Sequence, residues 1–196
     1  WFPGAHFDSG AFATFSVVAR GEATFGLQSV DGNGVSYPTE AWGFGIDLRY
    51  RLPVDDVTFG ITAGYGTSTF AIRDGGELSP RPAIPNVEYH VLRAGGSFRW
   101  DIGLGIFVDA EAAYLHPLAA GEITSAAWFP RAEVGGLDGA AGAGLRVDDV
   151  QIAARFEIQR FWYDMHAEPG DERVAGGAVD ERLSGVLSLV YTPSGL

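Results

Sequence analysis

The chain of 196 residues contains no cysteine and no lysine. Without cysteine it can form neither a disulfide framework nor a thiolate metal site. No window approaches the roughly eighteen consecutive apolar residues of a transmembrane helix, although 46% of the residues are hydrophobic. The net charge of −12 argues against a nucleic-acid partner, which would require a basic face. The opening residues 1–3 show neither the basic nor the apolar region of a signal peptide.

Glycine and acidic residues mark the expected connections between strands, and these connections alternate in length. Short turns are expected at residues 53–56, 100–103 and 147–150, where Asp and Gly favour hairpins. Long loops are expected at residues 31–40, 73–86, 121–136 and 165–179. In an up-and-down sheet this alternation places every short turn at one end, as in bacterial outer-membrane barrels with short periplasmic turns and long extracellular loops.

The segments between these connections alternate apolar and polar residues with a period of two, which predicts half-buried β-strands. They lie within residues 11–30, 42–52, 57–66, 87–100, 104–114, 137–147, 150–162 and 182–191. Across residues 11–30 the apolar side chains stay on one set of alternate positions and the polar side chains on the other. This segment is therefore interpreted as one long or interrupted strand, although a turn at Gly21 would divide it into two. The sequence therefore predicts an all-β, up-and-down antiparallel barrel of about eight strands.

Alternation leaves two arrangements open: a calycin-like soluble barrel encloses the apolar face, whereas a membrane barrel turns it toward lipid. The polar face favours the membrane, because it is rich in glycine and its charges of opposite sign nearly balance, as a buried lumen requires. We expect a lumen ion-pair network that plugs the interior, formed by Arg20, Glu22, Asp47, Arg49, Arg51, Arg93, Arg99, Asp109, Glu111, Asp138, Arg146, Arg155, Glu157 and Arg182.

Aromatic residues on the apolar face lie near the strand ends, where the two interfaces of a bilayer would meet the barrel. The expected aromatic girdles contain Trp42, Tyr50, Trp100, Tyr114, Trp162 and Tyr191. With the closing strand Leu187-Ser188-Leu189-Val190-Tyr191, this architecture resembles the small outer-membrane β-barrel superfamily (OmpA/OmpX/OmpW-like), from about Ala11 to Tyr191. The chain departs from that pattern because residues 192–196 follow the terminal aromatic residue.

The resemblance implies a transmembrane β-barrel domain at residues 11–192, between an N-terminal periplasmic segment at 1–10 and a C-terminal tail at 193–196. It also implies a bacterial outer-membrane location and contact with the lipid bilayer and lipopolysaccharide. Other envelope proteins would bind through the long acidic loops or the termini. The expected role is structural, adhesive or in an envelope complex; the alternatives are a narrow OmpW-like channel for small solutes, a soluble ligand-binding barrel and a lipid-modifying enzyme.

No catalytic constellation emerges from the four histidines. His90 and His116 are expected on the outward face near the loop end, and neither His116 nor His166 has the nearby serine of a His-x-Ser lipid deacylase. No Ser/His/Asp triad can be assembled from the spacing. We therefore expect no enzymatic activity, no cofactor and no metal site.

Overall fold

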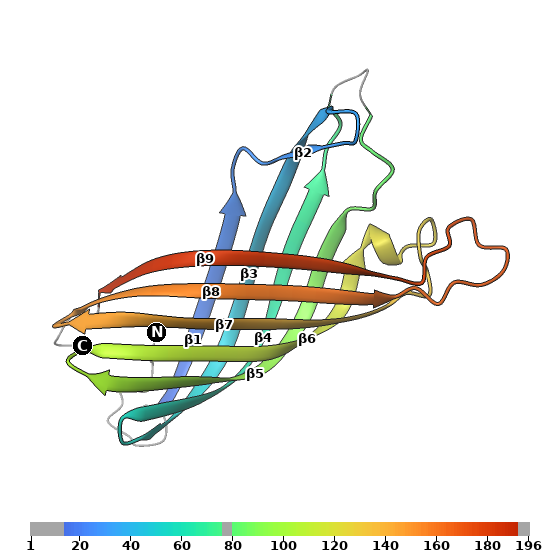
Figure 1. Ribbon diagram of the computed structural model, residues 1–196. Coiled ribbons are helices and arrows are strands. Elements are labelled where there is room, and N and C mark those ends of the chain that lie inside the picture. Colours follow the sequence, from blue (N-terminus) through green and yellow to red (C-terminus); the bar gives the residue numbers. More distant parts are fainter. Residues whose placement is uncertain (1–13, 76–79, 192–196) are drawn as a thin grey trace.

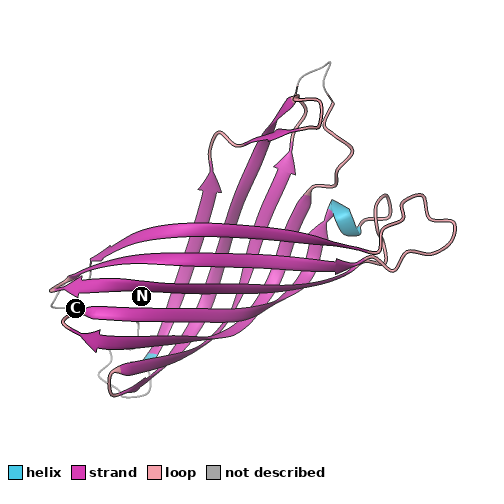
Figure 2. Ribbon diagram, in the orientation of Figure 1, coloured by secondary structure: helices cyan, strands magenta, loops and turns pink. Residues whose placement is uncertain are grey.

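The computed structural model describes residues 14–75 and 80–191, and almost all of this part is β-strand (Figure 2). The expected N-terminal segment at 1–10, His6 and the tail at 193–196 lie outside the described residues. The strands are β1 (Phe15–Thr24), β2 (Gln28–Val30), β3 (Ser36–Val54), β4 (Val57–Ile72), β5 (Val87–Gly103), β6 (Ile106–Gly121), β7 (Glu133–Val147), β8 (Val150–Asp164) and β9 (Gly177–Tyr191). One 3₁₀ turn, η3 (Glu122–Thr124), follows β6. Within this described part, no helix is long and apolar enough to cross a membrane.

Neighbouring long strands pair antiparallel in the order β1-β3-β4-β5-β6-β7-β8-β9, which is an up-and-down meander. The sheet curls so that β7, β8 and β9 pass in front of β1, β3 and β4, giving a half-barrel (Figure 1). The predicted all-β antiparallel fold is confirmed. Each expected strand segment overlaps one of these strands, except that residues 11–30 overlap both β1 and β2. The closed barrel differs from what is observed: in the described residues, no backbone pairing joins β1 to β9, and both strands remain sheet edges.

The described part of residues 11–30 forms an interrupted strand, as expected from the continuous alternation of apolar and polar residues. Both β1 and β2 pair antiparallel with β3, so the chain does not reverse between them. The interruption falls at Phe25-Gly26-Leu27, where Gly26 has a positive φ of 70°. The sheet therefore has eight long strands, with β2 as a short continuation beside the loop end of β3.

Two expected connections are misplaced. The turn predicted at residues 100–103 lies instead at Leu104-Gly105, because Asp101 and Gly103 still pair with Phe107 and Ile106. The long loop predicted at residues 31–40 is shorter, since β3 already begins at Ser36. Asp31 closes this tighter turn by accepting hydrogen bonds from the backbone N–H groups of Asn33 and Val35, each at 2.9 Å. A carboxylate that satisfies the local backbone allows the strands to continue further.

The loops at residues 121–136 and 165–179 are also shorter than expected, because β7 begins at Glu133 and β9 at Gly177. The remaining length asymmetry agrees with the prediction. Two-residue turns at 55–56, 104–105 and 148–149 occupy one end, and the longer loops occupy the other. We call these the turn end and the loop end.

The curl places the two faces of the sheet in opposite environments. On the convex face apolar side chains are exposed; Ile46 and Leu48, for example, are 45% and 51% exposed. On the concave face, Asp47 between them is only 1% exposed and Arg93 is 5% exposed. Because strand side chains alternate sides, the register that buries these charges turns the apolar residues outward.

Candidate functional site in the half-barrel interior

Arg93 of β5 lies at the centre of the interior charge network. Its Nε and Nη2 atoms donate to both carboxylate oxygens of Asp138 on β7, each at 2.9 Å. The same Nη2 atom donates to Glu111 on β6, and Nη1 lies 3.8 Å from Asp47 on β3. One guanidinium therefore links carboxylates from three strands, which suits its planar fork of donors.

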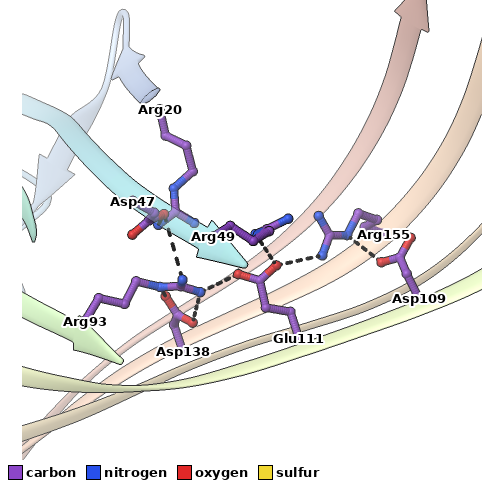
Figure 3. A network of polar contacts seen from close by, with 8 residues as sticks. All are labelled: Arg20, Asp47, Arg49, Arg93, Asp109, Glu111, Asp138 and Arg155. Carbon is purple, nitrogen blue, oxygen red and sulfur yellow. Dashed lines mark hydrogen bonds and ion pairs between the residues drawn. The ribbon is translucent and has the colours of Figure 1, made fainter. Parts of the chain in front are cut away.

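Glu111 is the second junction and extends the network toward β8 (Figure 3). Its Oε2 atom lies 3.1 Å from Arg49 Nη2 and 3.8 Å from Arg155 Nη2. Arg155 Nε in turn lies 3.0 Å from Asp109 Oδ1. At the other end, Arg20 Nη2 reaches Asp47 Oδ2 at 2.6 Å. The resulting alternation of charge crosses the interior from β1 to β8.

Glycines opposite the large interior side chains make room for this network. A Cβ atom added at Gly64 would lie 2.1 Å from Asp47 Oδ1, and one at Gly142 would lie 2.5 Å from Arg155 Cγ. These approaches are closer than real Cβ contacts. The glycine-rich polar face noted in the sequence therefore reflects close packing of charged side chains in a narrow interior.

The other expected members lie outside this central network. Arg182 on β9 pairs with Glu22 on β1, and Arg99 lies near the turn end, 3.0 Å from Asp101 and 3.7 Å from the ring centre of Phe107. Arg51 is exposed and lies close enough to Arg49 and Arg99 for the like charges to repel. No ion pair joins Arg146 or Glu157 to another of the described residues. The structure thus brings together Arg20, Asp47, Arg49, Arg93, Asp109, Glu111, Asp138 and Arg155.

Sequence reasoning missed an apolar cluster that fills the interior near the loop end. Tyr89 of β5 stacks on Phe161 of β8 with ring centres 3.8 Å apart. Its hydroxyl contacts that of Tyr163 and donates to Asp180 on β9 at 2.7 Å. The sequence did carry a usable signal. Tyr89 is separated from Arg93, and Phe161 and Tyr163 from Arg155, by an even number of positions along the same strand, so they share its interior face. The expected polar face is defined by its charges and glycines, and none of these three aromatic residues is assigned to it.

The six expected girdle residues all lie on the convex face. Tyr50, Trp100 and Tyr191 lie toward the turn end, and Trp42, Tyr114 and Trp162 lie nearer the loop end. Tyr50 packs on Phe15 with ring centres 4.8 Å apart, and Tyr114 contacts Trp162 at 6.4 Å. The aromatic residues therefore occupy two levels, with Ile46 and Leu48 between them.

The histidines His90 and His166 contact different partners. His90 contacts the Tyr65 hydroxyl at 2.5 Å and Glu88 at 3.2 Å on the convex face, and His166 lies in a loop beside Asp164. No group of three His, Asp or Glu residues within the described ranges could hold a metal ion.

The loop end is fixed by its own polar contacts. Glu122 in η3 accepts a backbone hydrogen bond from Asn86 at 3.0 Å and two from Arg81 at 2.9 and 3.1 Å. The Asn86 amide, followed by the Arg81 guanidinium, holds the pKa of this carboxyl below its ordinary value. Arg131 similarly ties the loop after β6 to Asp171 in the loop after β8.

Comparisons with family models, curated proteins and solved structures found no match to this chain. The functional argument therefore depends on the chain's own residues and geometry.

Proposed function

We propose that this chain is an outer-membrane β-barrel with a plugged polar lumen and a structural, adhesive or envelope-complex role. The observation that carries the proposal is that polar and apolar side chains are placed opposite to their arrangement in a soluble barrel, which encloses its apolar face. Most of the large apolar side chains of the strands are exposed on the convex face, while the charged residues Asp47 and Arg93 are buried on the concave face. An exposed apolar surface of this extent exceeds what soluble monomers tolerate, and lipid would cover it.

The edge strands support closure of such a barrel. Glu22 of β1 and Arg182 of β9 contact each other although they are 160 residues apart. Since β1 runs toward the loop end and β9 away from it, an antiparallel pairing with Glu22 opposite Arg182 places Val18 opposite Val186, both on the interior side. The pairing would satisfy the exposed edge groups, which is required in a bilayer.

The interior favours a plug over the alternative of a narrow channel. The network from Arg20 to Arg155 crosses the middle of the lumen, and Phe107 is completely buried beneath Arg99. The aromatic cluster around Tyr89 adds a third level near the loops. The loops would then present a surface to lipopolysaccharide or to other envelope proteins. Planar-bilayer recordings should accordingly show no conductance, and a stable single-channel current would favour the channel.

Heat-modifiable gel migration tests the barrel directly, because folded membrane barrels keep their shape in detergent until heated. The protein should migrate differently before and after boiling, and it should require detergent or lipid to remain monodisperse. A monodisperse, detergent-free species with unchanged migration would contradict the proposal.

A substitution pair tests which surface contacts lipid. Ile46 lies on the convex face between the two aromatic levels, so Ile46→Arg should lower the free energy of unfolding in lipid vesicles by about 2–4 kcal/mol. The control is Leu104→Arg in the turn, where the leucine is 96% exposed and the change should cost less than about 0.5 kcal/mol. Equal effects of the two substitutions would show that the convex face is not lipid-facing.

A further inference from the structure

The convex face carries a mixed aromatic and polar patch near its loop-end aromatic level, on the neighbouring strands β3, β4 and β5. Two rows of cross-strand partners form it: Trp42, Thr69 and Glu88 in the first, and Phe44, Thr67 and His90 in the second. Partners that face each other across an antiparallel sheet point to the same side, so all six side chains share the convex face. The β3 side of the patch is aromatic, and the β5 side is polar.

The two sides of this patch are separated by short side chains. Adjacent strands lie about 4.8 Å apart, so the backbones of β3 and β5 are roughly 10 Å apart. Only Thr67 and Thr69 stand between them on this face. Trp42 is 45% exposed and the Glu88 side chain is 53% exposed, so both are accessible from outside the sheet. The spacing is suited to an ammonium group held between the aromatic rings and the carboxylate.

Glu88 supplies the charge of the patch. His90 Nε2 lies 3.2 Å from its carboxylate, and His90 Nδ1 lies 2.5 Å from the Tyr65 hydroxyl. A neutral imidazole can make both contacts, because one ring nitrogen donates to the carboxylate and the other accepts from the hydroxyl. Among the described residues no arginine pairs with Glu88; Arg73, which follows β4, is held by Glu40 at 2.7 Å. The negative charge therefore has no guanidinium beside it on a surface that lipid would cover.

We propose that this patch binds a phospholipid through the ammonium group of its headgroup, with Glu88 as the counter-charge and Trp42 and Phe44 as aromatic partners. A carboxylate at the border of the hydrocarbon region is costly unless a cation pairs with it. Ammonium groups are also attracted to the faces of aromatic rings. The proposal rests on the proposed function, because it requires the convex face to contact a bilayer, and it adds the class of lipid.

The surroundings of the patch favour a lipid over a free ammonium compound. Toward the turn end the next row contains Ile46 and Leu92, which are 45% and 48% exposed on the same face. Acyl chains that extend from a headgroup at the patch would lie against these side chains, and a free amine would lack that contact. An anionic headgroup without an ammonium group would be repelled by Glu88.

A second carboxylate on the convex face shows what distinguishes Glu88. Glu181 on β9 lies opposite Arg160 on β8, and the two side chains form an ion pair at 3.7 Å. Both residues are on the face that carries Trp162 and Ile158, so Glu181 is already compensated by the protein itself. Glu181 is therefore a matched control: it has the same chemical group and the same face, but it does not need a lipid cation.

The test uses the full chain folded in a nonionic detergent at pH 8, with heat-modifiable migration checked first. Dihexanoyl phosphatidylethanolamine is titrated by calorimetry, and dihexanoyl phosphatidylglycerol and free ethanolamine serve as comparisons. The phosphatidylethanolamine should bind at least about tenfold more tightly than either comparison, because it alone combines an ammonium group with acyl chains. Equal binding of the phosphatidylglycerol would overturn the role of the ammonium group, and equal binding of free ethanolamine would overturn the assignment to a lipid.

Matched variants locate the site. Glu88→Gln should weaken phosphatidylethanolamine binding at least about tenfold, and Trp42→Leu should weaken it about threefold or more, whereas Glu181→Gln should leave it unchanged. Unchanged binding in Glu88→Gln, or an equal loss in Glu181→Gln, would contradict the proposal. If Glu88→Gln does not fold, Trp42→Leu still decides the question, since full binding without the indole ring would exclude this patch. A chain without a heat-modifiable form contradicts the barrel itself, whereas a folded chain without a preference for phosphatidylethanolamine contradicts only this lipid site.

Discussion

Replacing Arg93 with methionine should reveal how much the interior network contributes to stability. The Arg93 side chain is 4% exposed and contacts Asp47, Glu111 and Asp138. After the substitution Asp47 keeps Arg20 and Glu111 keeps Arg49, but Asp138 loses its described cationic partner. The cost is therefore mainly that of one uncompensated carboxylate.

Removing one partner of a buried ion pair costs about 3–5 kcal/mol, and the side chain of Asp138 retains 19% exposure. We thus expect Arg93→Met to lower the free energy of unfolding by about 3 kcal/mol, toward the lower end of that range. The double variant Arg93→Met/Asp138→Leu removes both charges and should recover to within about 1 kcal/mol of the unmodified protein. Methionine and leucine retain most of the packed volume.

The assay is equilibrium urea unfolding in lipid vesicles, followed by tryptophan fluorescence. Arg73→Met is the control, because Arg73 pairs with Glu40 at 2.7 Å but both side chains are more than half exposed. That exposed pair should contribute less than about 1 kcal/mol. The reasoning would be refuted if Arg93→Met cost no more than Arg73→Met, or if the double variant were no more stable than the single one.

Two further predictions concern packing and pH. Gly95→Ala should lower the free energy of unfolding by about 1–3 kcal/mol, because its Cβ atom would lie 2.4 Å from the Ala112 carbonyl oxygen; Gly185→Ala, with nothing within 4 Å of the new atom, should change it by less than about 0.5 kcal/mol. Equal effects in urea unfolding would contradict this account. The pKa of Glu122 is lowered from 4.5 by Asn86 and Arg81, so its stabilising contribution should be complete above pH 4.5 and disappear as the pH falls through the lower folded-state value. Glu122→Gln should therefore be less stable than the unmodified protein at pH 7 and approach it near pH 3; a difference independent of pH would argue against the contribution of the carboxylate.

Strand periodicity made the fold class predictable, and local chemistry determined how well its boundaries could be placed. The turns at residues 55–56 and 148–149 were predictable because Asp55 and Asp148 tolerate a positive φ. The Leu104-Gly105 turn was misplaced because leucine gives no such signal, although its φ is 53°. Asp31 marked a loop but not its length, which depends on the hydrogen bonds that it accepts.

The candidate site was predictable as a set of residues but not as a set of pairs. The alternation of side chains along each strand assigned Arg93, Glu111 and Glu157 to the polar face of their strands. Which carboxylate each arginine contacts depends on the curl of the sheet, which brings β1, β5 and β8 around a common interior. The isolation of Glu157 was invisible for the same reason, since it depends on Ala140 and Ser184 being its neighbours across the sheet.

The sequence by itself therefore determined the antiparallel strands, their two chemically different faces and the alternation of short and longer connections, because these follow from local periodicity and turn chemistry. Only the tertiary structure decided that the charged face is concave and the apolar face exposed, because alternation is the same in either direction of curl. It also decided the partners of the charges, the aromatic cluster at the loop end and the contact of Glu22 with Arg182. These features join residues far apart in the chain, and no local pattern encodes their distance.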